Sequence, residues 1–281
     1  MKWLILQSAG HHNGTDNFTK NDHMRECFAI QHALRQNNQE ADIWGKRHPN
    51  FATPPDFNSY DYIFLLENYE FEGIPDLSQF RKPKKLQWII DLHFQQTTYV
   101  PWSMQCDIIL HSTKALIHEY KWRVPGKRHL WFPNGVDDLN FTYNQQPKLL
   151  DIVFVGSLMN RGSFLQVQQI PHVFATGKDM IDTIASTKIH FNKPISCDVN
   201  YRNFETIGIG TCLLTQQLQE LEELGFKDNE NCLMYQTSPD CSRKLKESLA
   251  SGSWKDIALR GHEFSKTQTY TKRIETLLTQ L

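Results

Sequence analysis

Short apolar runs rich in β-branched and aromatic residues recur along this chain, and polar or helix-like stretches separate them. In the first half, such runs lie at residues 3–7, 41–44, 62–66, 86–90 and 107–110, and residues 22–36 have helical character. Near-continuous apolar strands with intervening helices are what a parallel sheet covered on both faces requires. The first half is therefore expected to be α/β.

A second series of apolar runs begins after the polar stretch at residues 143–148. Its strands are expected at 151–155, 172–175, 188–191, 211–215 and 232–235, and its helices at 180–186, 201–209, 238–250 and 254–281. This organisation predicts two Rossmann-like α/β domains, residues 1–145 and 146–281, whose sheets face a common cleft. Loops that follow strands are then the places to look for chemistry.

The charge balance narrows the possible partners. The 281 residues include 30 Lys and Arg against 31 Asp and Glu, a formal net charge of −1. A surface that tracks phosphates normally leaves a basic excess, so general nucleic-acid binding is disfavoured. A local basic patch around Arg81, Lys82, Lys84 and Lys85 stays open, beside the alternative of a solvated loop.

Composition also bears on the cellular compartment. No apolar run approaches the roughly 20 residues of a membrane helix, and residues 3–6 are too short for a signal-peptide core. Six cysteines are scattered with no metal-binding spacing, which favours reduced thiols. A cytoplasmic protein without a membrane span is expected.

Two segments resemble the GT-B glycosyltransferases. The stretch Pro133-Asn134-Gly135-Val136-Asp137, closed by Phe141, is similar to the interdomain signature of family 4, although Asn-Gly is also a common turn. The stretch from Asn200 to Thr215 resembles CgeB-like enzymes, in which Arg-x-Phe-Glu opens a helix. Further matches cover roughly residues 150–275 and include Lys188, Asn192, Leu221, Phe226, Tyr235, Tyr270 and Arg273.

The resemblance implies roles for residues of the second half. Glu205 corresponds to the glutamate that accepts hydrogen bonds from the ribose of a nucleotide-sugar, a task suited to a carboxylate. Arg161 is expected to neutralise the leaving diphosphate together with Lys188 or Arg202. Lys188 and Arg202 could each instead form a surface salt bridge. Gly156, Asn200 and the interdomain Asn134 are expected to line the substrate site.

In the first half, two loops after strands carry the candidates. The loop containing Gly10, His11 and His12 matches the glycine-bearing first loop of these folds, which approaches phosphate and acceptor. Asp91 and His93 directly follow a strand, and the resemblance places His93 beside the transferred sugar, where imidazole can donate to a hydroxyl or move a proton. A packed or solvated strand-end histidine is the alternative interpretation.

Two further features qualify the resemblance. The sequence has no Asp-x-Asp, the metal-binding pair of GT-A enzymes, and the histidines at 11 and 12 lack a third ligand at suitable spacing, so no metal and no cofactor are expected. Many family 4 enzymes have a glutamate eight residues before the ribose-binding one. Cys197 occupies that position here, so either Asp198 replaces the glutamate or the sugar is held differently.

Together these residues predict a two-domain GT-B fold, with a C-terminal helix that can cross back to the first domain. The expected activity is transfer of a hexose-like sugar from a UDP- or GDP-sugar to an unidentified acceptor, retaining and metal-independent. Two alternatives stay open: an inactive nucleotide-sugar or glycan-binding protein of the same fold, and a transferase that glycosylates modified nucleic-acid bases.

Overall fold

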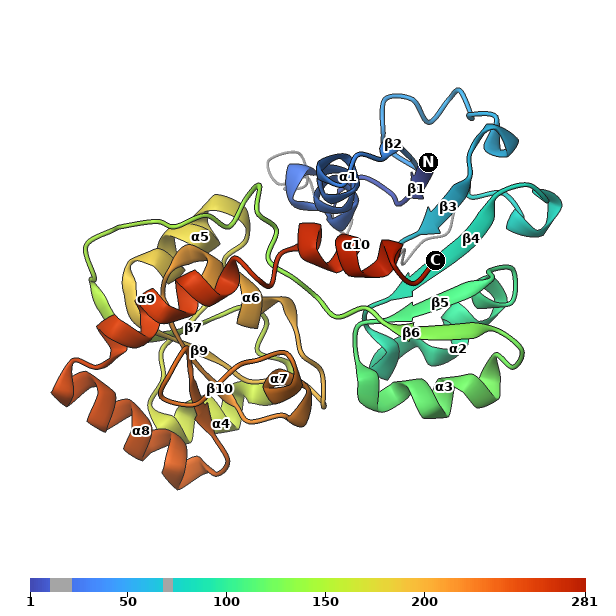
Figure 1. Ribbon diagram of the computed structural model, residues 1–281. Helices are drawn as coiled ribbons and strands as arrows, with labels where there is room; N and C mark the ends of the chain where they lie inside the picture. The colour runs from blue at the N-terminus through green and yellow to red at the C-terminus, as the bar shows by residue number, and fades with distance from the viewer. Residues whose placement is uncertain (11–21, 68–72) are drawn as a thin grey trace. The chain divides into compact units, whose positions relative to one another are not determined.

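The computed structural model describes residues 1–10, 22–67 and 73–281, without the side chains of residues 22 and 93–96. The chain divides into two compact units. The first comprises residues 1–133 and 270–281, and the second comprises residues 134–269. Each has its own parallel sheet with helices packed against it (Figure 1).

The described part of the first unit contains a six-stranded parallel sheet in the order β2-β1-β3-β4-β5-β6. Its strands are β1 (Lys2–Leu6), β2 (Glu40–Trp44), β3 (Tyr62–Leu65), β4 (Lys84–Ile89), β5 (Ile108–His111) and β6 (Arg128–Trp131). Five of these lie within a few residues of the expected positions. The edge strand β6 was not predicted, because Arg128-His129-Leu130-Trp131 is only half-buried and lacks an apolar run.

Helices cover both faces of this sheet. They are α1 (Glu26–Gln36), α2 (Leu92–Ser103), α3 (Ile117–Arg123) and the C-terminal α10 (Tyr270–Leu278). Tyr99 of α2 and Tyr120 of α3 pack in the core with Ile89. The adjacent Trp88 points to the other face, where its ring meets Tyr270 of α10 edge-on at 5.8 Å.

The second unit has a five-stranded parallel sheet in the order β11-β10-β9-β7-β8. Its strands are β7 (Leu150–Val155), β8 (His172–Val173), β9 (Thr187–Asn192), β10 (Cys212–Gln216) and β11 (Leu233–Tyr235). Its helices are α4 (Gly162–Gln168), α5 (Gly177–Ala185), α6 (Tyr201–Ile209), α7 (Gln219–Glu223), α8 (Ser238–Ser251) and α9 (Trp254–Ser265).

Strand β9 illustrates why both faces of this sheet must be covered. Ile189 and Phe191 pack with Leu165 of α4 and Cys241 of α8. The residue between them, His190, faces the other way and its Nδ1 lies 2.7 Å from the hydroxyl of Thr206 on α6. Alternation along the strand therefore fixes α4 and α8 on one face and α6 on the opposite face.

The units divide after Pro133, earlier than the boundary expected at residue 145. Residues 134–144 belong to the second unit because they pack along α6. A Cβ on Gly208 would lie 2.8 Å from Val136 and 2.9 Å from the carbonyl oxygen of Phe141. Gly210, with φ 87°, ends α6 in the left-handed region. Gly208 thus admits the chain segment and Gly210 ends the helix.

The last helix expected from the sequence, residues 254–281, is two helices. The break at residues 266–269 coincides with a backbone contact in which Val136 N–H donates to the carbonyl of Gln268 at 2.8 Å. Beyond the break, α10 belongs to the first unit, where the side-chain amide of Asn37 donates to the carbonyl of Thr271 at 3.0 Å. The C-terminal helix thus returns to the first unit, as the sequence allowed.

Candidate active site

Each sheet has one point where the order of its strands reverses, and this is where open α/β sheets bind ligands. In the first unit the reversal lies between β1 and β3, and in the second between β7 and β9. Loops leave the carboxyl ends of these neighbouring strands in opposite directions. In each unit, the residues that follow its two neighbouring strands are therefore the first candidates for ligand contacts.

Arg161 lies in the loop after β7 of the second unit, and it is only 6% exposed. Its Nε donates to the carbonyl of Lys193, which follows β9, and its Nη1 donates at 3.1 Å to the carbonyl of Ser157. Burial lowers the pKa of this guanidinium, an effect that the nearby charge of Asp198 opposes. No described carboxylate forms an ion pair with Arg161. A buried cation held by two carbonyls and by the ring of Phe154, 5.4 Å from the guanidinium, but without an ion pair, favours an anionic ligand.

Asn200, Arg202 and Glu205 lie at the start of α6. Asn200 caps the helix, since its side-chain oxygen accepts from Arg202 N–H at 3.1 Å. Arg202 Nε donates to the carbonyl of Val155 at 3.1 Å, and Arg202 Nη1 forms an ion pair with Glu205 Oε2. Two guanidinium groups, those of Arg161 and Arg202, thus bind the backbone on either side of Gly156.

Glu205 keeps one oxygen for a ligand. Its side chain is 13% exposed, and only Oε2 is engaged by the arginine. Glu205 Oε1 has no hydrogen-bond partner among the described residues, so a ligand hydroxyl can donate to it. Gly156, with φ 144°, lies between the two carbonyls that Arg161 and Arg202 bind, in a backbone conformation that favours glycine. The structure therefore brings Gly156, Arg161, Asn200, Arg202 and Glu205 together.

Lys188 is not part of this group. It lies near the amino end of β9, about 13 Å along the strand from its carboxyl end at ~3.3 Å per residue. Its ammonium forms a 2.6 Å ion pair with Asp151, at the amino end of β7. A diphosphate beside Arg161 is beyond its reach, so the catalytic role expected for Lys188 does not fit its position.

Asn134 begins the segment that packs on α6. It is buried, and its side-chain amide donates to the carbonyl of Val199 at 3.0 Å, in the connection from β9 to α6. This bond fixes the loop that leads to Asn200. Cys197 lies half-buried in the same connection, and the carboxylate of Asp198 accepts from Ser196 N–H.

In the first unit, the expected residues are only partly described. Gly10 is buried with φ 77° after β1, whereas His11 lies outside the described residues. Asp91 is half-buried at the residue before α2, and its N–H donates at 3.2 Å to Glu67 Oε1. His93 is in the first turn of α2, but its side chain lies outside the described residues.

Glu67 is a site residue that the sequence analysis missed. It follows β3, is 6% exposed and accepts the hydroxyl of Tyr99 as well as Asp91 N–H. Burial, together with the charge of Asp91, raises the pKa of Glu67 well above its ordinary value. Gln7, which follows β1, donates to the carbonyl of Glu67 at 3.0 Å and to Glu26 at 2.8 Å. The sequence does contain a clue to both residues, because Gln7 and Glu67 are each a polar residue at the end of an apolar run.

A buried amide network was missed as well. Asn192, at the end of β9, donates to the side-chain oxygens of Asn200 at 3.0 Å and of Asn203 at 2.9 Å. The hydroxyl of Thr215 on β10 donates to the same oxygen of Asn203 at 3.0 Å. This network fixes the start of α6 against the sheet, and thereby the position of Glu205.

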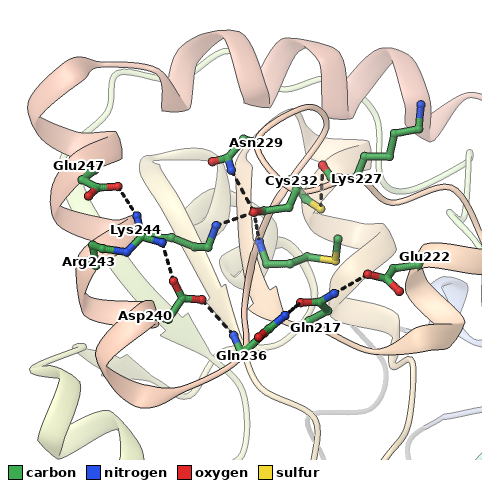
Figure 2. A network of polar contacts seen from close by, with 12 residues as sticks. Gln217, Glu222, Lys227, Asn229, Cys232, Gln236, Asp240, Arg243, Lys244 and Glu247 are labelled. Carbon is green, nitrogen blue, oxygen red and sulfur yellow. Dashed lines mark hydrogen bonds and ion pairs between the residues drawn. The ribbon is translucent and has the colours of Figure 1, made fainter.

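Farther along the sheet, polar side chains satisfy one another (Figure 2). After β10 and β11, Gln236 donates to Gln217 at 2.7 Å, and Gln217 donates to Glu222. On α8, the ammonium of the buried Lys244 is paired with Asp228. These groups are already partnered, so the candidate site is restricted to the β7–β9 end of the sheet.

Comparisons with known proteins agree with this geometry. Residues 143–279 match the family model described as glycosyl transferase-like. The solved structure of HepE from Anabaena, in complex with UDP and glucose, is 12% identical with a TM-score of 0.61, and 100% of each chain is covered. Sucrose-phosphate synthase from Thermosynechococcus elongatus is 12% identical with a TM-score of 0.62, covering 100% of this chain and 99% of that one. The chain has the GT-B fold of glycosyltransferases.

A third GT-B structure is also similar. It is an alpha-glucosyltransferase in complex with UDP and a 13-mer DNA containing an HMU base, 10% identical with a TM-score of 0.67, covering 99% of this chain and 98% of that one. No curated protein matches the sequence. The family description is general, so the CgeB-like relationship stays a prediction.

The described residues offer neither a metal site nor a membrane-spanning helix. In the described part of this GT-B chain, no group of three or more His, Cys, Asp or Glu side chains could hold a metal ion. Among the same residues, no helix combines the length and the apolar composition needed to cross a bilayer. The six cysteines are all free thiols, and five of them are buried.

Proposed function

We propose that this protein transfers a sugar from a nucleotide-sugar, with UDP as the first nucleotide to test, to an acceptor that remains to be found. The observation that carries the proposal is the pairing of two guanidinium groups with one accessible carboxylate oxygen at the β7–β9 reversal. Glu205 Oε1 would accept the ribose hydroxyls, and Arg161 would bind the diphosphate. The UDP complexes of similar GT-B structures support this choice of nucleotide.

We further propose a retaining, metal-independent hexosyl transfer. Negative charge on the diphosphate grows as the glycosidic bond breaks, so cations fixed beside it stabilise the transition state more than the ground state. Arg161 and Arg202 can supply this charge, with Arg202 shared with Glu205. The departing phosphate oxygen would take the proton of the acceptor hydroxyl as the new bond forms, so no protein nucleophile is required. We also propose that His93 orients the sugar and that Asp91 contacts the substrate.

A thermal-shift titration with UDP, GDP and ADP tests the donor site. Wild type should be stabilised by UDP, since a ligand at 100 times its dissociation constant stabilises by ~2.7 kcal/mol. The Glu205→Ala variant should lose most of the response. Glu247→Ala is a matched control, because Glu247 is also an ion-paired helix glutamate of the second unit but lies on α8. A wild type that responds to no nucleotide would sink the proposal.

Incubation with UDP-glucose separates an enzyme from a binding protein. An enzyme releases UDP, and proton NMR of the released sugar at early times shows whether its anomeric configuration is retained. The same release in EDTA would support metal independence. A thermal response without UDP release from any UDP-sugar would instead favour the alternative of an inactive sensor.

We also propose that the protein works in the cytosol. Burial raises the pKa values of Cys27 and Cys106 to about 12, so both remain neutral packed thiols. Free thiols of this kind persist in a reducing compartment. Fractionation of cells that express a tagged chain is the test.

A second candidate acceptor is a modified base in nucleic acid. The observation that favours it is the similar alpha-glucosyltransferase solved with UDP and HMU-containing DNA. Radiolabelled UDP-glucose offered with hydroxymethyluracil-containing duplex DNA, or with the unmodified duplex as control, would distinguish this acceptor from a free glycan.

A further inference from the structure

The amino edge of the first sheet carries a row of cations that the proposed function does not use. Two backbone hydrogen bonds show that the starts of β4, β5 and β6 lie side by side at this edge. Asp107 N–H donates to the carbonyl of Lys85 at 2.8 Å, and Arg128 N–H donates to the carbonyl of Asp107 at 3.3 Å. Lys84, the first residue of β4, and Arg128, the first residue of β6, therefore belong to one row. The row is extended by the residues before β4 and by the end of α3, which lies beside β6 (Figure 1). We call this row the basic stripe: Arg81, Lys82, Lys84, Lys121, Arg123, Lys127 and Arg128.

Few acidic groups offset the basic stripe. Asp107 lies within it as one negative charge, and its carboxylate accepts from Lys85 N–H at 2.8 Å. Asp61 neighbours Lys84 and accepts from Lys2 N–H, while Glu119 pairs with Arg123 at 3.6 Å. Lys85, by contrast, is buried and does not contribute. Of the residues suspected from the sequence, Arg81 and Lys82 are exposed and Lys84 is half-buried.

Trp122 of α3 has two stripe cations, Lys121 and Arg123, as its neighbours in sequence, and it is 79% exposed. Tryptophan is usually highly buried, so this exposure is unusual. The ring meets His118 edge-on at 6.3 Å, which leaves a broad face open to solvent. Exposed aromatic rings interleaved with cations characterise surfaces that bind single-stranded nucleic acid, where bases stack and phosphates meet Lys and Arg.

A membrane surface fits these residues less well. An interfacial helix buries a wide apolar face, whereas α3 has seven residues and its buried ring, Tyr120, already faces the core. Trp122 is the only large exposed hydrophobic residue of this helix.

The surface also lies at the amino ends of the strands, the opposite edge of the sheet from Glu67 and Asp91, so it is separate from the candidate site of this unit.

We propose that the basic stripe and Trp122 form a docking surface for single-stranded nucleic acid, with phosphates on the stripe and one base stacked on Trp122. The surface lies within the first unit and does not depend on the proposed function. Transfer to a free glycan and binding of a polynucleotide at this edge can both hold.

Fluorescence anisotropy of a labelled 20-nucleotide single strand tests the surface. Trp122→Ala should weaken binding roughly 10-fold, because stacking contributes ~1–3 kcal/mol per base. Arg81→Glu with Lys82→Glu should lower the slope of log affinity against log salt by about 1.4, at ~0.7 for each phosphate that is no longer neutralised. The matched controls are Phe174→Ala, 71% exposed in the second unit, and Lys246→Glu on α8, and both should bind as wild type does.

Several results would overturn the inference. These are no binding by wild type at 50 mM salt, equal losses in the control variants, unchanged binding by both surface variants, or binding to phosphatidylserine vesicles without binding to the oligonucleotide. The UDP thermal shift is measured on each variant in parallel. A normal UDP response with lost oligonucleotide binding supports this surface alone, and a missing UDP response in wild type bears only on the proposed function.

Discussion

The carboxyl edges of the two sheets have similar topology but opposite charge. In the second unit, Arg161 and Arg202 bind the chain on both sides of Gly156, and a single carboxylate, Glu205, partners one of them. In the first unit, Glu67 and Asp91 lie at the equivalent edge, and Glu67 is buried with a raised pKa.

This contrast teaches how one topology can serve two kinds of ligand. A buried guanidinium without an ion-pair partner gains most from an anion, which suits the phosphates of a donor. Buried carboxyl groups repel phosphate and suit hydroxyl groups, which can donate to them. The reversal of strand order selects where a ligand binds, and the side chains at that point select its charge.

The largest expected effect concerns the cation that distinguishes the two edges. Arg161→Ala should lower the rate of UDP release from a UDP-sugar by about 10²–10³, by analogy with the loss of one donor from an oxyanion site. Arg161→Lys should retain part of the rate because it keeps the charge but not the two backbone hydrogen bonds. Steady-state kinetics measure both variants.

Stability must be checked in the same variants, because Arg161 is buried and holds the Lys193 carbonyl. If Arg161→Ala unfolds at the wild-type urea midpoint and still turns over at a wild-type rate, the charge contrast has no role in donor binding.

Gly208→Ala should produce the next largest effect and confine it to the second unit. Its Cβ would lie 2.8 Å from Val136 and 2.9 Å from the Phe141 carbonyl, so the segment on α6 would have to move, at about 1–3 kcal/mol of unfolding free energy. Urea unfolding followed by far-ultraviolet circular dichroism measures the loss. Gly162→Ala is the control, since nothing lies within 4 Å of its added Cβ.

The two units should respond separately in that experiment. Trp254 is the one tryptophan of seven in residues 134–269, so tryptophan fluorescence reports mainly on the first unit. A fluorescence transition that shifts as much as the dichroism transition would show that the units unfold together.

The sequence was sufficient for the strands but not for the charge contrast. Apolar runs located most strands because a strand buried on both faces needs them. Glu67 was missed because its burial depends on Tyr99 and Asp91, which are distant in sequence. Lys188 was misplaced because a match in sequence does not show which end of a strand a residue occupies.

Glu67→Gln should sharpen the contrast through the pH dependence of stability. In the folded protein the pKa of Glu67 is raised above its ordinary value of 4.5, so between the two values the folded state holds a proton that the unfolded state has released. Stability contributed by this group is therefore complete below about pH 4.5 and decreases as the pH rises towards the folded pKa, by up to ~1.4 kcal/mol per pH unit.

The glutamine variant lacks this titration. Its stability relative to wild type should increase from pH 5 to pH 8, as measured by urea unfolding with tryptophan fluorescence. A constant difference across this range would mean that Glu67 ionises normally in the folded protein.

The smallest effect is expected at Lys188, which tests whether position within the same unit matters as much as charge. Lys188 and Asp151 form an ion pair at the amino edge with side chains 34% and 63% exposed, and exposed pairs contribute ~0–1 kcal/mol. Lys188→Ala should therefore change turnover by less than about 2-fold and the unfolding free energy by less than ~0.5 kcal/mol. The UDP thermal shift should match that of wild type, because Lys188 lies about 13 Å along β9 from its carboxyl end and its ammonium is paired with Asp151. A loss of turnover comparable to that of Arg161→Ala would place the diphosphate within reach of the amino edge, and the assignment of the donor to the carboxyl edge would then fail.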